Sequence, residues 1–202
     1  MKRGTEMRNS RFFGLLLLLV LLAACSTAPR LPDQSNTVKN QADDSLLLAS
    51  QLLLQDKPAE AYSLFRKALH LSQRVDSGRG VVLALIGLGD VANRLGEAGA
   101  EGYYVQAEII AGYYELENEA AQAVIRRAEL RIQAREPDAA LEIMVGLEDG
   151  IQSGSMEEAL LLHARGTARR LQEQYSLAVE LLEKAVRLAE KNHDLIAASG
   201  SL

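Results

Sequence analysis

Four segments of the chain repeat one pattern of small and large apolar residues, and this repetition constrains the fold more than any other feature. Each segment has a small residue, a large apolar residue four positions later and usually another small residue three positions after that. The segments are AEAYSLFRKAL (59–69), GAEGYYVQAEI (99–109), DAALEIMVGLE (138–148) and SLAVELLEKAV (176–186). Their small residues Ala61, Ala100, Ala140 and Ala178 are 39, 40 and 38 residues apart. Such a period is typical of stacked structural units.

The residues in and around these segments favour helices. In the first segment, apolar residues recur at steps of three and four, the stripe of an amphipathic helix; they are Ala61, Leu64, Phe65, Ala68, Leu69 and Leu71. No alternation of β-branched or aromatic residues lasts four positions. Pro58 and Pro137 suit the first turn of a helix. Helix breakers cluster at 76–78, 96–99, 150–155 and 192–194. The sequence therefore predicts an all-α fold.

The repeated pattern resembles the tetratricopeptide family, whose second helix has an alanine, an aromatic residue and an alanine at this spacing. Leu88-Gly89 matches the Leu-Gly pair of the family's first helix, and Gly166 has the corresponding place in the fourth segment. The resemblance implies an α-solenoid of about four antiparallel helix pairs. The implied domain covers 42–198, with repeats near 42–76, 78–112, 117–150 and 156–191 and a disordered tail at 199–202. The period near 40 departs from the family's usual value of about 34.

The first 24 residues have the layout of a secretory signal peptide. Four basic residues and one acid precede the apolar run 12–22, and small residues follow it. Eleven residues rise only about 16 Å as a helix, whereas a bilayer core of about 30 Å needs about 20 residues. A cleaved signal at 1–24 is therefore favoured over a permanent transmembrane helix.

The only cysteine, Cys25, follows this apolar run after Ala23 and Ala24. Leu22-Ala23-Ala24-Cys25 resembles the lipobox of bacterial lipoproteins, which implies cleavage before Cys25 and attachment of acyl chains to it. Ser26 takes the place of the aspartate that marks retention in the inner membrane, so the resemblance implies an outer membrane anchor that faces the periplasm. Burial as a free thiol is the other use of a lone cysteine. Residues 25–41 are rich in small polar residues and predict a flexible tether.

Charge and composition narrow the classes of partner. The chain has a net charge of -5 and becomes more acidic once the basic signal peptide is removed. This balance disfavours nucleic acid and anionic lipid as general partners. We therefore expect no nucleic acid binding, and membrane attachment only through the lipid on Cys25.

Motifs for catalysis or metal binding are missing from the sequence. His70, His163 and His193 have no second histidine or cysteine at metal-ligand spacing. The pairs Asp43-Asp44 and Glu157-Glu158 are expected at helix starts, where carboxylates complement the helix dipole. We therefore expect no catalytic residue, no metal and no cofactor, and a protein that is not an enzyme.

What remains is a surface for binding other proteins. In the tetratricopeptide family the first helices line a concave groove that takes up peptides or helices. Aligning Ala49, Gly89, Ala128 and Gly166 places these candidates on it: Leu46, Ser50, Leu53, Ile86, Asp90, Asn93, Ile125, Glu129, Ile132, His163, Thr167 and Arg170. Some of the apolar ones could instead belong to the core between repeats. The stripe Arg127, Arg131 and Arg135 is either a solvated face or an interaction surface.

The C-terminal segment 194–202 starts like another first helix, with Asp194 as its cap, and breaks after about one turn. Leu177, Leu181 and Leu188 would then be partly uncovered, which predicts docking of the fourth repeat onto a partner or a second copy. The expected function is a periplasmic adaptor or scaffold lipoprotein, in envelope assembly, pilus or secretion machinery. The alternative is a lipid-anchored regulator or accessory subunit of a cell-wall or protease enzyme.

Overall fold

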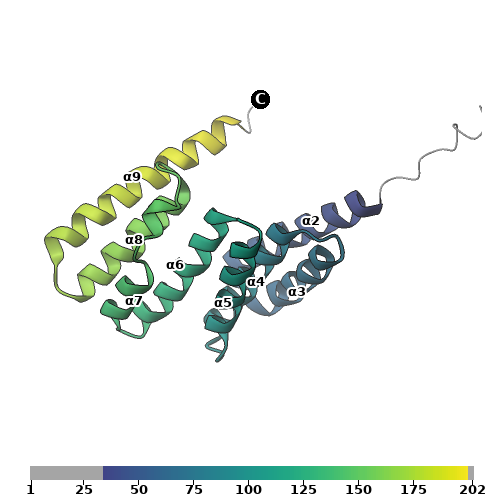
Figure 1. The fold of residues 1–202 in the computed structure, drawn as a ribbon, viewed down its shortest axis with the longest axis horizontal. Coiled ribbons are helices and arrows are strands. Elements are labelled where there is room, and N and C mark those ends of the chain that lie inside the picture. The colour runs from purple at the N-terminus through teal and green to yellow at the C-terminus, as the bar shows by residue number, and fades with distance from the viewer. Residues whose placement is uncertain (1–33, 200–202) are drawn as a thin grey trace, which may run out of the picture. The chain divides into compact units, whose positions relative to one another are not determined.

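A computed structural model describes the backbone of residues 34–199. In that range the chain contains eight α-helices, one short 3₁₀-helix and no strand, so the predicted all-α class is confirmed (Figure 1). The predicted signal peptide at 1–24 and the predicted lipid attachment at Cys25 lie outside the described residues. Among the helices described, none has both the length and the apolar character that a membrane span needs.

The helices follow one another at short intervals along the chain. They are α2 (Gln34–Leu54), α3 (Pro58–Arg74), α4 (Gly78–Leu95), α5 (Ala100–Tyr113), α6 (Glu117–Gln133), α7 (Pro137–Ile143), η1 (Leu147–Asp149), α8 (Met156–Leu171) and α9 (Tyr175–Ser199). Each of the four segments expected to be a repeat therefore holds two consecutive α-helices. The third pair differs from the others because α7 has only seven residues.

Two helix ends differ from the sequence expectation. Helix α2 begins at Gln34, so residues 34–41, expected in the tether, are helical. Asp43 and Asp44 consequently lie inside the helix and do not cap it. No glycine or proline interrupts residues 34–54, and the buried Ala42 anchors this part of the helix.

At the other end of the chain, α9 runs through the expected break at 192–194 and ends at Ser199. Asn192 does not end the helix because its side-chain amide donates hydrogen bonds to the carbonyls of Leu188, at 2.7 Å, and Gly154, at 2.9 Å. Residues 194–199 therefore continue α9, and Asp194 is not the cap of a further helix.

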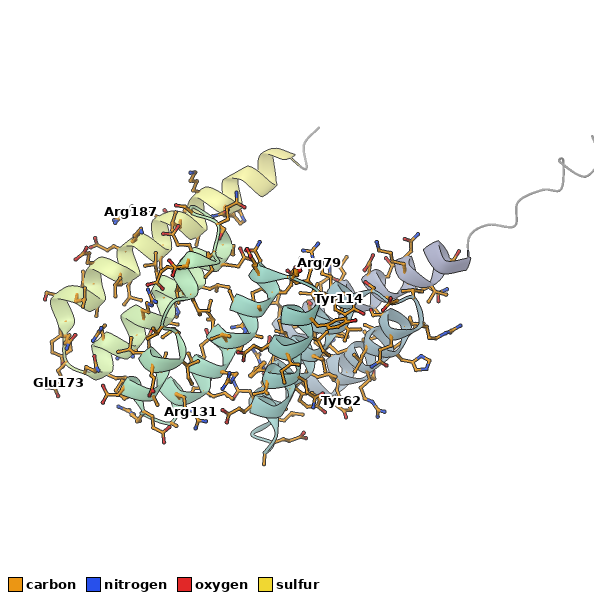
Figure 2. The ribbon with its side chains drawn as sticks, in the orientation of Figure 1. Tyr62, Arg79, Tyr114, Arg131, Glu173 and Arg187 are labelled. Atoms are coloured by element: carbon orange, nitrogen blue, oxygen red, sulfur yellow. The ribbon has the colours of Figure 1, made fainter. Side chains whose placement is uncertain are left out.

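Six turns between helices share one backbone conformation. In each turn one residue is left-handed, and two backbone N–H groups bond back to the end of the preceding helix, as in a Schellman motif. The left-handed residues are Asp56, Asp76, Gly96, Glu115, Arg135 and Glu173. In the turn between α8 and α9 (Figure 2), for example, Gln174 N donates to Arg169 O and Glu173 N donates to Arg170 O. Glycine occupies this position in only one of the six turns.

The core consists of three clusters, each shared by consecutive helices. The first joins α2, α3 and α4, the second α4, α5 and α6, and the third α6, α7 and α8. Most of the repeated small and large residues are buried: Ala61, Phe65, Ala68, Ala100, Tyr104, Ala107, Ala140, Met144, Ala178 and Ala185. Leu147 and Leu182 are half-buried. The sequence pattern thus marks the residues that hold neighbouring helices together.

Polar contacts also join helices of consecutive pairs. Arg94 at the end of α4 lies 3.0 Å from Asp56 in the turn after α2. Tyr114 Oη, after α5, donates to Asp76 in the turn after α3 at 2.6 Å. The first turns of α4 and α6 are joined in the same way by Arg79 Nε and Glu119 Oε1, at 2.6 Å. Helix ends are therefore tied across pairs as well as within them.

Candidate functional site

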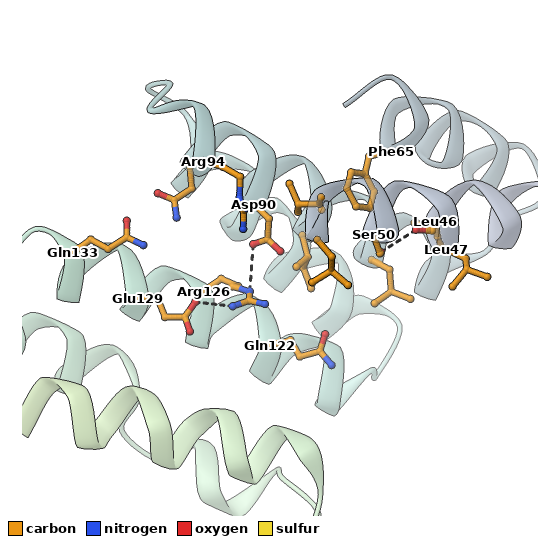
Figure 3. A pocket seen from close by; sticks show the side chains of 16 residues that line it. Leu46, Leu47, Ser50, Phe65, Asp90, Arg94, Gln122, Arg126, Glu129 and Gln133 are labelled. Atoms are coloured by element: carbon orange, nitrogen blue, oxygen red, sulfur yellow. Dashed lines mark hydrogen bonds and ion pairs between the residues drawn. The ribbon is translucent and has the colours of Figure 1, made fainter. Parts of the chain in front are cut away.

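A groove of about 850 Å³ lies along α2, α4 and α6 (Figure 3). These are the first helices of three consecutive pairs, and α3 contributes one residue, Phe65. The lining residues are Leu46, Leu47, Ser50, Leu53, Leu54, Phe65, Leu83, Ile86, Gly87, Asp90, Asn93, Arg94, Gln122, Arg126, Glu129 and Gln133. The groove is larger than four other hollows over the described residues, whose volumes run from about 440 to about 620 Å³.

The α2 side of the groove is apolar. Four leucines of α2 line it, and two of them are open to solvent: Leu47 is 62% exposed and Leu54 is 87% exposed. Ser50 adds no free donor, because its hydroxyl donates to the carbonyl of Leu46 within α2 at 2.9 Å. Large exposed leucines that line a hollow suit the apolar side chains of a binding partner.

The α4 and α6 side is polar and is organised by one carboxylate. Asp90 Oδ1 accepts a hydrogen bond from Tyr104 Oη at 2.8 Å and lies 3.3 Å from Arg126 Nε. Arg126 Nη1 in turn donates to Glu129 Oε2 at 2.8 Å. Tyr104 is buried, whereas the side chains of Asp90, Arg126 and Glu129 are 24%, 35% and 26% exposed. The network therefore presents fixed charges to the groove from a buried support.

Burial dominates the protonation of this network. It raises the pKa of Asp90, and the neighbouring Arg126 and the hydrogen bond from Tyr104 only partly oppose it. Burial also raises the pKa of Tyr104, with Asp90 adding to the effect, so its hydroxyl stays a donor. For Arg126 burial favours the neutral form, but Asp90 and Glu129 outweigh it and raise the pKa. Arg126 is thus held as a cation between two carboxyl groups.

Seven of the twelve residues expected in the groove line it. They are Leu46, Ser50, Leu53, Ile86, Asp90, Asn93 and Glu129. They come from α2, α4 and the middle of α6, so the groove brings together most of the candidates from the first three segments.

The other five expected residues lie elsewhere. Ile125 is buried and Ile132 is half-buried, and both pack in the core shared by α6, α7 and α8. On α8, His163 and Arg170 are exposed, and Thr167 Oγ1 donates to the carbonyl of His163 at 2.9 Å. The α8 candidates do not line this groove.

The error on α6 is a shift in register. Its groove face consists of Gln122, Arg126, Glu129 and Gln133, so Arg126 and Gln133 stand one position after the expected isoleucines. Ile125 and Ile132 instead pack in the core that contains Met144. The alternation of polar and apolar residues along 122–133 is the only sequence signal that could have shown this.

Two of the three arginines in the stripe form ion pairs with the preceding helix, and the third is exposed. Arg127 Nη1 lies 2.5 Å from Glu108 Oε2, and Arg131 Nη2 lies 2.7 Å from Glu101 Oε1. Both acids belong to α5, so these arginines fasten α6 to the preceding helix. Arg135 is the left-handed residue of the turn before α7 and is exposed.

Glu158 bonds backbone groups at the start of α8, and the three histidines lie on the surface. Glu158 accepts a hydrogen bond from Gly154 N at 2.6 Å, and its own backbone N–H donates to Ser155 Oγ at 3.2 Å. The expected place of this acid in the first turn of α8 is therefore confirmed, and Ser155 is the cap of the helix. His70, His163 and His193 are all exposed. Across the described residues, His, Cys, Asp and Glu side chains form no group of three that could hold a metal ion.

No protein-family model matches the chain. No curated protein matches it either. Its function is therefore inferred from the groove and from the sequence itself.

Proposed function

We propose that this protein is an adaptor lipoprotein of the outer membrane that holds a segment of a partner protein at the periplasmic face. The observation that carries the proposal is the groove along α2, α4 and α6, which combines exposed leucines with a fixed polar network. Such a surface suits binding of a peptide or helix.

The proposal includes a tetratricopeptide-like origin for the helix pairs. The buried small and large residues recur on the second helices at nearly constant spacing, as the family pattern requires. Gly89 supports the same assignment, because a Cβ there would lie 2.4 Å from the Tyr104 ring. A small residue in the first helix thus receives the aromatic residue of the second.

The proposed anchor depends on the lipobox-like residues 22–25. Cys25 stands nine positions before the start of α2. A lipid at this position would hold the helices near the bilayer, and several acyl chains would make the attachment stable.

The groove ligand is proposed to be an amphipathic segment. Its apolar side chains would pack on Leu47 and Leu54, where both are open to solvent. Its polar groups would lie along Asp90, Asn93 and Gln133, the side of the groove that carries carboxylate and amide groups.

Groove variants test the binding function. Leu47→Glu and Leu54→Glu change exposed side chains, so the fold should persist while the apolar side of the groove is lost. Leu95→Glu is the matched control, because Leu95 is 46% exposed and lies outside the groove lining. Proteins crosslinked to each variant in intact cells would be quantified by mass spectrometry after detergent solubilisation. Partners kept by Leu95→Glu and lost by the groove variants support the proposal. An identical partner set for all three contradicts it.

The anchor is tested separately. Cys25→Ala should leave the signal peptide uncleaved and remove the acyl chains. Intact mass and membrane fractionation of the two proteins report both events. A variant with the same processing and the same outer membrane location as the original chain would refute the anchor.

A further inference from the structure

The last described helix, α9, carries an apolar stripe that is open to solvent. Val179 is 54% exposed and Val186 is 55% exposed, although α9 packs closely against α8 through Ala178 and Ala185. Val179 and Val186 are seven residues apart, which is two helical turns, so they lie on one face.

The register of α3 shows what this face corresponds to. Ala61, Phe65 and Ala68 of α3 align with Ala178, Leu182 and Ala185 of α9. In this alignment Leu69 corresponds to Val186 and Ser72 to Ala189. Leu69 packs against the clusters that α4 shares. Ser72 is buried, and a Cβ on Gly80 of α4 would lie 2.4 Å from its hydroxyl oxygen. The part of the α9 face at Val186 and Ala189 thus corresponds to the part by which α3 holds the next helix. Val179 corresponds to Tyr62, which is 36% exposed.

A hollow of about 620 Å³ lies at the corresponding end of α9. It is lined by Met156, Ala189, Glu190 and His193. Ala189 corresponds to Ser72, which lies against Gly80 in the first turn of α4. The hollow on α9 is therefore at the position where, on α3, the N-terminal turn of α4 packs. Together, the stripe and the hollow form a surface on which one more helix could pack.

The side chains on α9 indicate which residues that helix would present to it. Helix α5 has Glu108 at the position of Val186, and Glu108 pairs with Arg127 of α6. Helix α3 has Leu69 there, and α4 meets it with buried aliphatic residues such as Val81 and Leu85. With Val186 at this position, α9 matches an aliphatic helix like α4 and not an arginine-bearing helix like α6.

We propose that α9 is a second docking surface, which binds an amphipathic helix of another protein in the way that α3 binds α4. The bound helix would place aliphatic residues on Val179 and Val186 and a small residue opposite Ala189. It would extend the helix packing already present within the chain. The groove residues belong to other helices, so each surface can be lost while the other remains.

A peptide with the sequence of α4, residues 78–95, is a direct probe of this surface. Labelled with fluorescein, it would be titrated with the purified full-length chain in detergent and followed by fluorescence anisotropy. We expect saturable binding that Val179→Glu and Val186→Glu each weaken about tenfold or more, since a charge would enter an apolar contact. Val145→Glu is the matched control, because Val145 is 75% exposed and lies after α7; it should bind as the original chain does.

Three outcomes would overturn the proposal. The peptide could fail to bind, or the α9 variants could bind it as tightly as Val145→Glu does. Light scattering could also show a dimer that Val186→Glu converts to a monomer while the peptide does not bind, in which case a second copy covers α9. Circular dichroism checks that each variant is still folded. The peptide titration does not depend on the groove, so a failure of the groove proposal would leave its outcome unchanged.

Discussion

At the scale of single residues, two glycines of α4 determine how the groove is built. A Cβ on Gly87 would lie 2.2 Å from the Phe65 ring, and a Cβ on Gly89 would lie 2.4 Å from the Tyr104 ring. The absence of side chains lets both rings lie directly against the backbone of α4. Tyr104 can then reach Asp90, so a packing residue also fixes the central carboxylate of the groove.

Gly89→Ala should destabilise the protein by roughly 1–3 kcal/mol, because the rigid Tyr104 ring leaves no room for a methyl group. Thermal unfolding followed by circular dichroism measures the change. Gly102→Ala is the matched control: Gly102 lies in α5 with nothing within 4 Å of its Cβ position. Replacement there should stabilise the helix by about 0.5–1 kcal/mol. Equal effects of the two substitutions would contradict the close contact.

Asp90 should titrate above its ordinary value of 3.8, because burial disfavours its charged form. Because the folded state binds this proton more tightly than the unfolded state, protonation of Asp90 stabilises the fold. The free energy of unfolding should therefore fall as pH rises from the unfolded-state pKa through the folded-state pKa. Carbon NMR of the Asp90 carboxyl measures the pKa. In Asp90→Asn the corresponding fall in unfolding free energy should disappear. An Asp90 pKa at or below 3.8 would show that Arg126 outweighs burial.

At the scale of helices, the turns depend on backbone hydrogen bonds more than on residue type. Five of the six left-handed positions hold Asp, Glu or Arg, although this conformation favours glycine. The two hydrogen bonds that close each turn hold those residues in place.

Glu173→Gly should therefore stabilise the protein by up to about 1 kcal/mol, because glycine has no Cβ to strain a left-handed backbone. Glu180→Gly is the control, since Glu180 is an exposed residue inside α9. That change should cost about 1 kcal/mol through lost helix propensity. Chemical denaturation of both variants gives the two free energies. Destabilisation by Glu173→Gly would mean that the turn carries no such strain.

The helices were predictable to different degrees. Ala61, Phe65 and Ala68 revealed the second helices, since small and large residues at this spacing pack between helices wherever they recur. The turn at Glu173 carried no such signal, because neither glycine nor proline marks it. The groove face of α6 was missed because Ile125 packs in the core with Met144 and does not line the groove. That effect depends on packing between helices, and the alternation of polar and apolar residues along 122–133 marks it only weakly.

At the scale of the whole described chain, the extensive contacts join helices that are adjacent or next but one in sequence. Stability is then built from neighbouring contacts and can differ along the chain. We expect α7 and the turns after it to be the weakest part of the described chain, because this helix buries only Ala140. The twelve residues that separate α7 from α8 include only the three-residue η1 as a helix.

Native-state hydrogen exchange should show this difference. Amides of residues 137–155 should exchange well before those of α4 and α5, whose side chains form the largest continuous cluster. Mass spectrometry of proteolytic fragments measures the order. Exchange of all these segments at one common rate would indicate a single cooperative unit instead.

The polar ties between consecutive pairs have a consequence for how such a chain can grow. Two of these contacts, Arg94 with Asp56 and Tyr114 with Asp76, join residues that are 38 positions apart. The third, Arg79 with Glu119, joins residues that are 40 positions apart. A duplication of one complete helix pair within the gene would give each tie an equivalent partner in the new copy. Duplication of a single helix would place these polar side chains opposite residues that do not pair with them. Addition of whole helix pairs would therefore keep the contacts between pairs, whereas addition of a single helix would break them.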